Sequence, residues 1–303
     1  MNKGGEYVSK IVLLSDSSCD LPPSIIEKYN IETIPYYVSF DAETYQKEIL
    51  ELSLKDFYQR LRSERIFPKT SLPSINDYYQ RFVPHAEANH RIICICLSGH
   101  FSGSYNAAVN ARELILEKYP NMQIEIINSL NATGGQGLLV KEVGRMIEAG
   151  LPFEQIVILA QNLRESARIF FFVETLDYLE HGGRIGKAAA LLGTMLNVKP
   201  IIYLKDGLLF PAGKARGTKK AISKVLDLTK DYLGDDAQTY SYLIAHADNT
   251  EYADILREEL LQTSSSLDIC EDYAFIGTTI GVNTGADVAG ICLMKKYENF
   301  LEQ

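Results

Sequence analysis

Two short segments of the sequence gather hydroxyl-bearing residues and glycines, which are residue types that can hold an anion. One reads Lys69-Thr70-Ser71-Leu72-Pro73-Ser74 and forms a loop that leads into a predicted helix. The other reads Ser98-Gly99-His100-Phe101-Ser102-Gly103-Ser104 and directly follows an apolar strand. Ser102 stands where a helix N-cap is expected, beside backbone N–H groups that are free to bind an anion. Plain helix capping explains the same spacing, but the glycines would also let a ligand approach the backbone closely.

A third segment combines glycines with basic residues. It reads Leu179-Glu-His-Gly-Gly-Arg184-Ile-Gly-Lys187, and a second basic group, Lys214-Ala-Arg216-Gly, follows further along the chain. Such clusters can bind a phosphate or an acidic protein surface. An ordinary solvent-exposed face explains them equally well.

The usual catalytic and metal-binding signatures are out of register in this chain. Residues 182–188 resemble a phosphate-binding loop, but the first glycine falls one position late and Ala188 replaces the metal-binding Ser or Thr. The five histidines lack metal-ligand spacing, and Cys94 and Cys96 share one strand face, which favours core packing. We therefore expect no metal and no cofactor.

The residues leave two classes of function open, an enzyme and a protein-interaction module. In a serine hydrolase or esterase, Ser102 would be the nucleophile and His100 or His246 the base, although the serine lies one position too far along for G-x-S-x-G. In a protein-interaction module, the chain would hold no small ligand at all.

The elements that must position these residues fall into two groups. Over the first 165 residues, short apolar strands alternate with helices, for example a buried strand over residues 91–97 followed by a helix over residues 103–119. Two Ser-x-x-Asp patterns predict helix starts at Ser53 and Ser74. This alternation predicts right-handed βαβ crossovers and a parallel sheet covered on both faces, in a Rossmann-like arrangement.

The rest of the chain has a different pattern. Short helical segments are expected around residues 175–180 and 186–196, and the dipeptide Asp206-Gly207 between two apolar runs predicts a β-hairpin. Strands over residues 240–246, 268–275 and 289–293, with helices over residues 219–232 and 252–262, predict an α+β domain. We place the boundary so that the N-terminal α/β domain spans residues 1–168 and the C-terminal α+β domain residues 169–303.

Composition excludes several classes of partner. The chain has 303 residues, 46% of them hydrophobic, and its net charge of −9 is opposite in sign to that of a generic nucleic-acid binder. No apolar run approaches the roughly 20 residues that span a bilayer, although transient contact with a membrane stays open. Five scattered cysteines fit a reducing cytoplasm better than a disulfide framework.

Several motifs, in order along most of the chain, give the sequence a resemblance to the DegV family of bacterial fatty-acid-binding proteins. The N-terminal motifs are Ser15-Asp16-Ser17-x-x-Asp20-Leu-Pro, Lys69-Thr70-Ser71-x-Pro73-Ser74 and Ser98-Gly-x-x-Ser102-Gly-Ser104-Tyr105. The later ones are Asn128-Ser-x-x-Ala-Thr-Gly-Gly-Gln-Gly137, Leu176-Asp-Tyr-Leu-x-x-Gly-Gly-Arg184-Ile and Asn197-Val-Lys199-Pro200-Ile.

The resemblance implies a protein that holds one long-chain fatty acid between two α/β domains. It implies further that the protein is not itself an enzyme, and that it presents the fatty acid to a separate acyl kinase, which phosphorylates the carboxylate. By position, Thr70 and Ser102 match the hydroxyl residues that bind the carboxylate, with Ser71, Gly103 and Asn283 as further candidates for the head-group loops. Arg184 and Arg216 match basic positions at the head-group rim and the kinase interface.

The chain departs from the family pattern in its late glycine-rich segment. Family members carry a histidine followed by Thr-Gly-Pro-Gly, where this chain has Gly281-Val-Asn283-Thr-Gly285-Ala-Asp287. Asn283 can donate a hydrogen bond but cannot be protonated as histidine can. Asp287 adds a negative charge near the expected position of the carboxylate.

Overall fold

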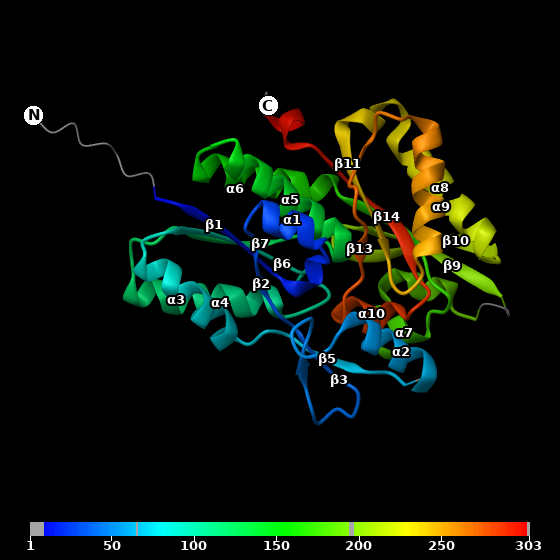
Figure 1. The fold of residues 1–303 in the computed structure, drawn as a ribbon, viewed down its shortest axis with the longest axis horizontal. Helices are drawn as coiled ribbons and strands as arrows, with labels where there is room; N and C mark the ends of the chain where they lie inside the picture. The colour runs from blue at the N-terminus through cyan, green and yellow to red at the C-terminus, as the bar shows by residue number, and fades with distance from the viewer. Residues whose placement is uncertain (1–8, 65, 194–196, 302–303) are drawn as a thin grey trace, which may run out of the picture.

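A parallel sheet organises the first half of the chain in the computed structural model, which describes residues 9–64, 66–193 and 197–301 (Figure 1). Its strand order is β2-β1-β6-β7, and all neighbours are parallel. The strands are β1 (Ile11–Asp16), β2 (Glu32–Ile34), β6 (Arg91–Cys96) and β7 (Ile124–Asn128). Helices α3 (Ile75–Glu87) and α4 (Ser104–Lys118) cover one face, and α5 (Thr133–Glu148) covers the other. The predicted parallel α/β/α sheet is confirmed.

A second, seven-stranded sheet of mixed direction organises the other half, with the order β10-β9-β8-β14-β11-β12 and with β13 also paired to β11. Its strands are β8 (Arg168–Phe172), β9 (Val198–Lys205), β10 (Leu208–Arg216), β11 (Tyr240–His246), β12 (Asp268–Ile269), β13 (Ala274–Phe275) and β14 (Ala289–Lys295). The hairpin predicted at Asp206-Gly207 joins β9 to β10. Helices α8 (Thr218–Leu233) and α9 (Thr250–Thr263) pack on one face.

Helix α5 lies between the two sheets and joins their cores. It contacts β1 and β6 of the first sheet and β11 and β14 of the second, and 12 of its 16 residues are buried. Its glycines permit this close packing, because a Cβ on Gly134 would lie 2.8 Å from Cys292 Sγ. Helices α1 (Pro23–Lys28) and α6 (Phe153–Ser166) flank α5 (Figure 1).

A small third sheet and three helices complete the region between the main sheets. The sheet has the order β4-β3-β5, formed by β3 (Tyr37–Ser39), β4 (Gln46–Lys47) and β5 (Lys69–Ser71). Beside it lie α2 (Leu54–Glu64), α7 (Asp177–His181) and α10 (Thr278–Thr284) (Figure 1). Helix α10 contacts β3, β5 and α7, so a segment near the C-terminus packs against the N-terminal half.

Three local predictions were wrong. Residues 69–71 form strand β5 rather than a loop, because β3 pairs with them. Asn283, expected in a head-group loop, lies in helix α10, which packs against Phe57 and Tyr58 of α2. The strand predicted over residues 268–275 is split into β12 and β13, which pair separately with β11.

Short 3-10 helices lie in some of the remaining connections and after the last strand. They are η1 (Ser17–Cys19), η2 (Gly186–Leu191), η3 (Gly234–Thr239) and η4 (Tyr297–Phe300). The helix predicted over residues 186–196 corresponds to η2, and residues 194–196 lie outside the described residues. The domain boundary between residues 168 and 169 stays a prediction. Among the described residues, no helix has the length and apolar character that a membrane crossing requires.

Candidate functional site

An internal cavity is lined by residues from both halves of the chain. The cavity has a volume of about 150 Å³, which is about ten times the volume that one ordered water needs. Its apolar lining comprises Leu72, Leu97, Phe101, Ala132, Ile169, Phe171, Leu179, Leu204, Leu209, Ala245, Ile276, Ile280 and Val288. Its polar lining comprises Tyr36, Thr70, Ser102, Thr133, Arg184, Thr279, Asn283 and Thr284. A mostly apolar cavity with several fixed polar groups suits an amphipathic small molecule.

The two hydroxyl-rich segments meet at this cavity. Thr70 lies in the middle of β5, and Ser102 lies in the turn between β6 and α4. A Cβ placed on Gly103 would lie 3.3 Å from Leu72 Cδ2, so the segments that carry the two hydroxyls are in contact. The structure therefore brings Thr70, Ser102 and Gly103 to the lining of the same cavity.

The hydroxyl of Ser102 has two donors around it. The Tyr36 hydroxyl donates to Ser102 Oγ at 2.9 Å, and the Ser104 N–H donates to the same oxygen at 3.2 Å. The N-cap residue of α4 is Gly103 and not Ser102. Ser102 precedes the cap, and its hydroxyl still accepts from the Ser104 N–H, as a capping serine would. Within the part of the chain that the structure describes, neither His100 nor His246 is hydrogen-bonded to Ser102, and His246 instead stacks on Phe275.

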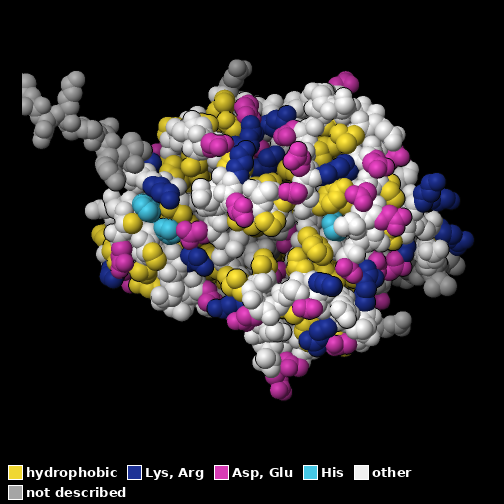
Figure 2. All heavy atoms as spheres, in the orientation of Figure 1, with side chains coloured by type: hydrophobic (Ala, Val, Ile, Leu, Met, Phe, Trp, Pro, Cys, Tyr) yellow, Lys and Arg dark blue, Asp and Glu magenta, His cyan; other side chains and the backbone are white. Residues whose placement is uncertain are grey.

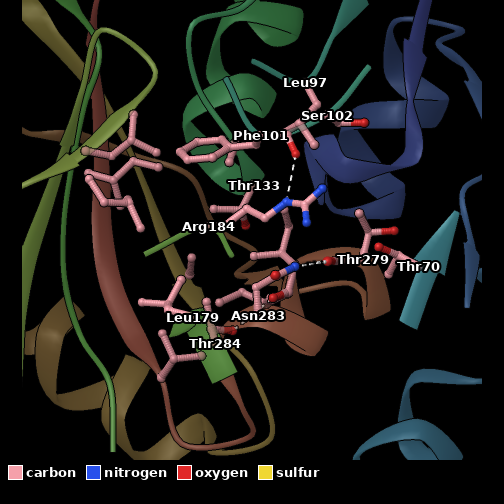
Figure 3. A pocket seen from close by; sticks show the side chains of 18 of the residues that line it. Thr70, Leu97, Phe101, Ser102, Thr133, Leu179, Arg184, Thr279, Asn283 and Thr284 are labelled. Carbon is pink, nitrogen blue, oxygen red and sulfur yellow. Dashed lines mark hydrogen bonds between the residues drawn. The ribbon is translucent and has the colours of Figure 1, made fainter. Parts of the chain in front are cut away.

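Arg184 bridges two loops at the cavity. Its Nε donates to the Phe101 carbonyl at 3.0 Å and its Nη1 to the Gly182 carbonyl at 2.6 Å. In Figure 3, Arg184 lies between Ser102 on one side and Thr70, Thr279 and Asn283 on the other. Its side chain remains exposed, so a positive charge sits where the cavity meets solvent.

Asn283 also lines the cavity, and its amide already makes one hydrogen bond within the protein. Its Nδ2 donates to the Thr279 carbonyl at 3.1 Å, within α10 (Figure 3). Its Oδ1 lies 2.1 Å from the point where a Cβ on Gly182 would be, so the amide packs directly on the end of α7. Asn283 thus helps to join α10 to α7.

Two candidate residues lie away from the cavity lining. Ser71 follows Thr70 on β5 and is exposed, because successive side chains on a strand point to opposite faces. Arg216 is exposed at the end of β10. Charged side chains of both signs alternate over the face of the molecule drawn in Figure 2.

Two buried acids, Asp16 and Glu48, accept hydrogen bonds from residues in or next to the polar lining. Asp16 accepts hydrogen bonds from four donors: Ser18 Oγ, Gln136 Nε2, Leu97 N and Ser104 Oγ. Burial raises the pKa of Asp16, and these hydrogen bonds oppose that shift. Glu48 accepts from the backbone N–H of Thr279 at 3.2 Å and from its hydroxyl at 2.6 Å.

Asp20 lies beside Glu48. Both Asp20 Oδ1 and Glu48 Oε1 lie within 2.6 Å of the point where a Cβ on Gly277 would be. Burial, and then the negative charge of Glu48, hold the pKa of the Asp20 carboxyl well above its usual range. Within the described residues, no group of three or more His, Cys, Asp or Glu side chains could hold a metal ion.

Sequence reasoning missed four polar residues of the lining: Tyr36, Thr133, Thr279 and Thr284. Thr133 lies in one of the motifs that carry the family resemblance, and that motif could have identified it. Tyr36 lies in an apolar stretch that is indistinguishable from core. Thr279 and Thr284 belong to α10, the helix that the sequence did not predict.

Comparisons with known proteins agree along nearly the whole chain. A family model described as "Uncharacterised protein, DegV family" matches residues 10–296. A DegV domain-containing protein of Clostridium acetobutylicum is 33% identical over 293 residues, which are 96% of this chain and 100% of that protein. One from Clostridium perfringens is 34% identical and covers 92% of this chain and 95% of its own.

Solved structures give the same result. A stearic acid-binding protein from Eubacterium ventriosum has a TM-score of 0.88 and 38% identity, covering 96% of this chain and 99% of its own. A fatty-acid-binding DegV family protein from Thermus thermophilus has a TM-score of 0.84 and 28% identity, covering 94% and 99%. The fatty acid binding protein DegV from Bacillus subtilis has a TM-score of 0.82 and 27% identity, covering 95% and 100%.

The fold and the cavity define a mixed α/β protein whose two halves enclose an internal apolar site. The chain belongs to the DegV family.

Proposed function

We propose that this protein binds a long-chain fatty acid in the cavity and presents its carboxylate to a separate acyl kinase, without catalysing a reaction itself. The observation that carries the proposal is the lining, which is mostly apolar and includes the hydroxyls of Thr70 and Ser102. The fatty acids named for the related structures from E. ventriosum and T. thermophilus support the same ligand class.

The two parts of such a ligand contribute unequally to its affinity. Burial of the alkyl chain stabilises the complex by about 0.8 kcal/mol per methylene, or roughly 10 kcal/mol gross for about 13 methylenes. A hydrogen bond to the charged carboxylate contributes about 1.5–3 kcal/mol. The apolar lining therefore supplies most of the affinity, and the hydroxyl pair fixes which end faces the rim at Arg184.

The kinase partner and the cellular location belong to the same proposal. Arg184 is exposed at the cavity and Arg216 is exposed on β10, so both are accessible to an acidic surface. A location in the cytoplasm is supported by the five cysteines, all of which are free thiols.

The primary test is extraction and mass spectrometry of lipid from protein purified out of a bacterial host, followed by fatty-acid titration. We expect bound long-chain fatty acid in the wild type and weaker binding in the double variant Thr70→Val/Ser102→Ala. The matched control is Thr250→Val/Ser223→Ala, which removes two exposed hydroxyls from α9 and α8. Absence of fatty acid from the wild type in both measurements would overturn the proposal.

Two further assays separate the alternatives. Hydrolysis of short acyl esters that is lost on Ser102→Ala would favour an esterase. With a cognate acyl kinase and ATP, Arg216→Glu should keep fatty-acid binding and lose acyl phosphorylation, whereas Lys224→Glu on α8 should keep both. Normal phosphorylation with Arg216→Glu would remove Arg216 from the partner surface.

A further inference from the structure

The hydrogen bonds around Ser102 leave its hydroxyl proton without a protein acceptor. A serine hydroxyl has one proton to donate and two lone pairs that accept. Tyr36 and the Ser104 N–H donate to the oxygen, and no described residue accepts the proton in return. The Ser102 hydroxyl is therefore set up to donate to a ligand in the cavity.

Tyr36 is held from several directions. Its backbone N–H donates to Ser17 Oγ at 3.0 Å, its carbonyl accepts from the Glu48 N–H at 2.9 Å, and its ring is only 2% exposed. Burial and the nearby charge of Asp16 hold the pKa of its hydroxyl well above the usual range, so the group stays a donor. Such a fixed donor leaves the Ser102 hydroxyl few alternative orientations.

Asp16 fixes the loop that carries Ser102. One oxygen, Asp16 Oδ2, accepts from the Leu97 N–H at 2.9 Å and from the Ser104 hydroxyl at 2.8 Å, which lie on either side of the turn. Since Ser104 donates its only proton to Asp16, the nearby Tyr78 hydroxyl must be the donor in its 2.5 Å contact with Ser104. Asp16 and Ser17, from the motif near the start of the chain, thus support the Ser102 loop and Tyr36.

We infer that Tyr36 is a positioning residue, which orients the Ser102 hydroxyl so that its proton points to the carboxylate of the bound ligand. The inference rests on the proposed function and adds to it a residue that does not itself have to touch the carboxylate. It also assigns direction to the contact: Ser102 donates, and the ligand accepts.

The test is a double-mutant cycle with hexadecanoate as the probe. Tyr36→Phe should weaken binding by about fivefold, because the Ser102 hydroxyl loses its orienting partner. In the Ser102→Ala background, the same substitution should have no further effect. Affinity for methyl hexadecanoate, whose head group is a neutral acceptor, should change much less.

Tyr78→Phe is the matched control, since it also removes a fully buried tyrosine hydroxyl from this network but one that bonds Ser104 instead of Ser102. We expect it to cost similar stability in urea unfolding and to leave hexadecanoate affinity within about twofold of the wild type. An equal loss of affinity from Tyr36→Phe with and without Ser102 would overturn the inference, as would no loss at all. If the wild type binds hexadecanoate but Tyr36→Phe binds it equally well, only the positioning role fails. If the wild type does not bind hexadecanoate, the proposed function fails with it.

Discussion

The guanidinium of Arg62 donates two hydrogen bonds to the carboxylate of Asp287, from Nη1 at 2.8 Å and from Nη2 at 2.9 Å. The Arg62 Nε also donates to Asp248 at 2.9 Å. Arg62 lies on α2, and both acids follow it by more than 180 positions in the chain. The negative charge that Asp287 brings close to the cavity is therefore compensated from the other half of the protein.

Removing this compensation should weaken binding of an anionic ligand. Arg62→Gln leaves Asp248 and Asp287 uncompensated, and at a separation of about 10 Å in water one such charge changes affinity by about twofold. We expect the loss at about 0.01 M salt and its disappearance at about 1 M, where charges are screened. Hexadecanoate titration at both salt concentrations measures the effect.

The double variant Arg62→Gln/Asp287→Asn provides the control. It should recover part of the affinity at low salt, because one of the two uncompensated charges is gone. A loss that is the same at both salt concentrations would show that Arg62 acts through packing and not through charge.

The buried pair of Asp20 and Glu48 should make stability depend on pH. Burial and the charge of Glu48 hold the pKa of Asp20 in the folded protein well above its ordinary value, so folding favours the protonated form. Its stabilising contribution is complete below the unfolded pKa and is lost as the pH rises through the native pKa. Asp20→Asn should therefore gain stability over the wild type as the pH increases.

Urea unfolding at about pH 5 and about pH 8 tests this expectation, since both lie above the unfolded pKa. Asparagine suits the backbone, because Asp20 has φ +46° and asparagine tolerates that region. Asp227→Asn, at an exposed position on α8, is the control and should not alter the pH dependence. Parallel pH profiles for the wild type and Asp20→Asn would contradict the prediction.

Much of the architecture was predictable because local pattern and tertiary structure agree. The apolar strand at residues 91–97, the Asp206-Gly207 hairpin and the capping box of Ser74 with Asp77 all carry their structure in adjacent residues. The small sheet and α10 could not be predicted in this way, because neighbouring residues do not determine them. Strand β5 has three residues and α10 has seven, and both depend on partners far away in the sequence, such as β3 and α2.

The residues of the candidate site also fall into those that the sequence predicted and those that it did not. Thr70 and Ser102 stand in recognisable motifs, and the cavity brings both to its lining. Tyr36 is separated from Ser102 by 66 positions, and Arg62 from Asp287 by 225. The local pattern of a single sequence carries no information on contacts between residues so far apart, so neither pair could be predicted.

Gly281 is required for the position of α10. A Cβ there would lie 2.6 Å from Tyr58 Oη and 2.8 Å from Phe57 Cε1, both on α2. Gly281→Ala should therefore destabilise the protein by about 1–3 kcal/mol, whereas the same change in an unobstructed helix stabilises. Thermal unfolding measures the cost, and increased stability would show that α10 can shift without penalty.

Asn283 offers a test of the head-group chemistry, because histidine occupies the corresponding place in the family pattern. Asn283→His would bring a titratable ring to the cavity lining, where the amide is neutral at every pH. A bound carboxylate raises the pKa of a nearby imidazole, so the gain in affinity is present below the imidazole's pKa in the free protein. It is lost as the pH rises through the pKa in the complex.

We therefore expect Asn283→His to bind hexadecanoate more tightly than the wild type at about pH 6 and to lose that advantage at about pH 8. Asn283→Gln is the control, since it keeps a neutral amide and should introduce no pH dependence of this kind. The larger ring must also fit against Gly182, which lies next to Asn283 Oδ1, so thermal unfolding of the variant is measured in parallel. A stable Asn283→His protein whose affinity matches the wild type at both pH values would show that position 283 joins α10 to α7 and does not contact the carboxylate.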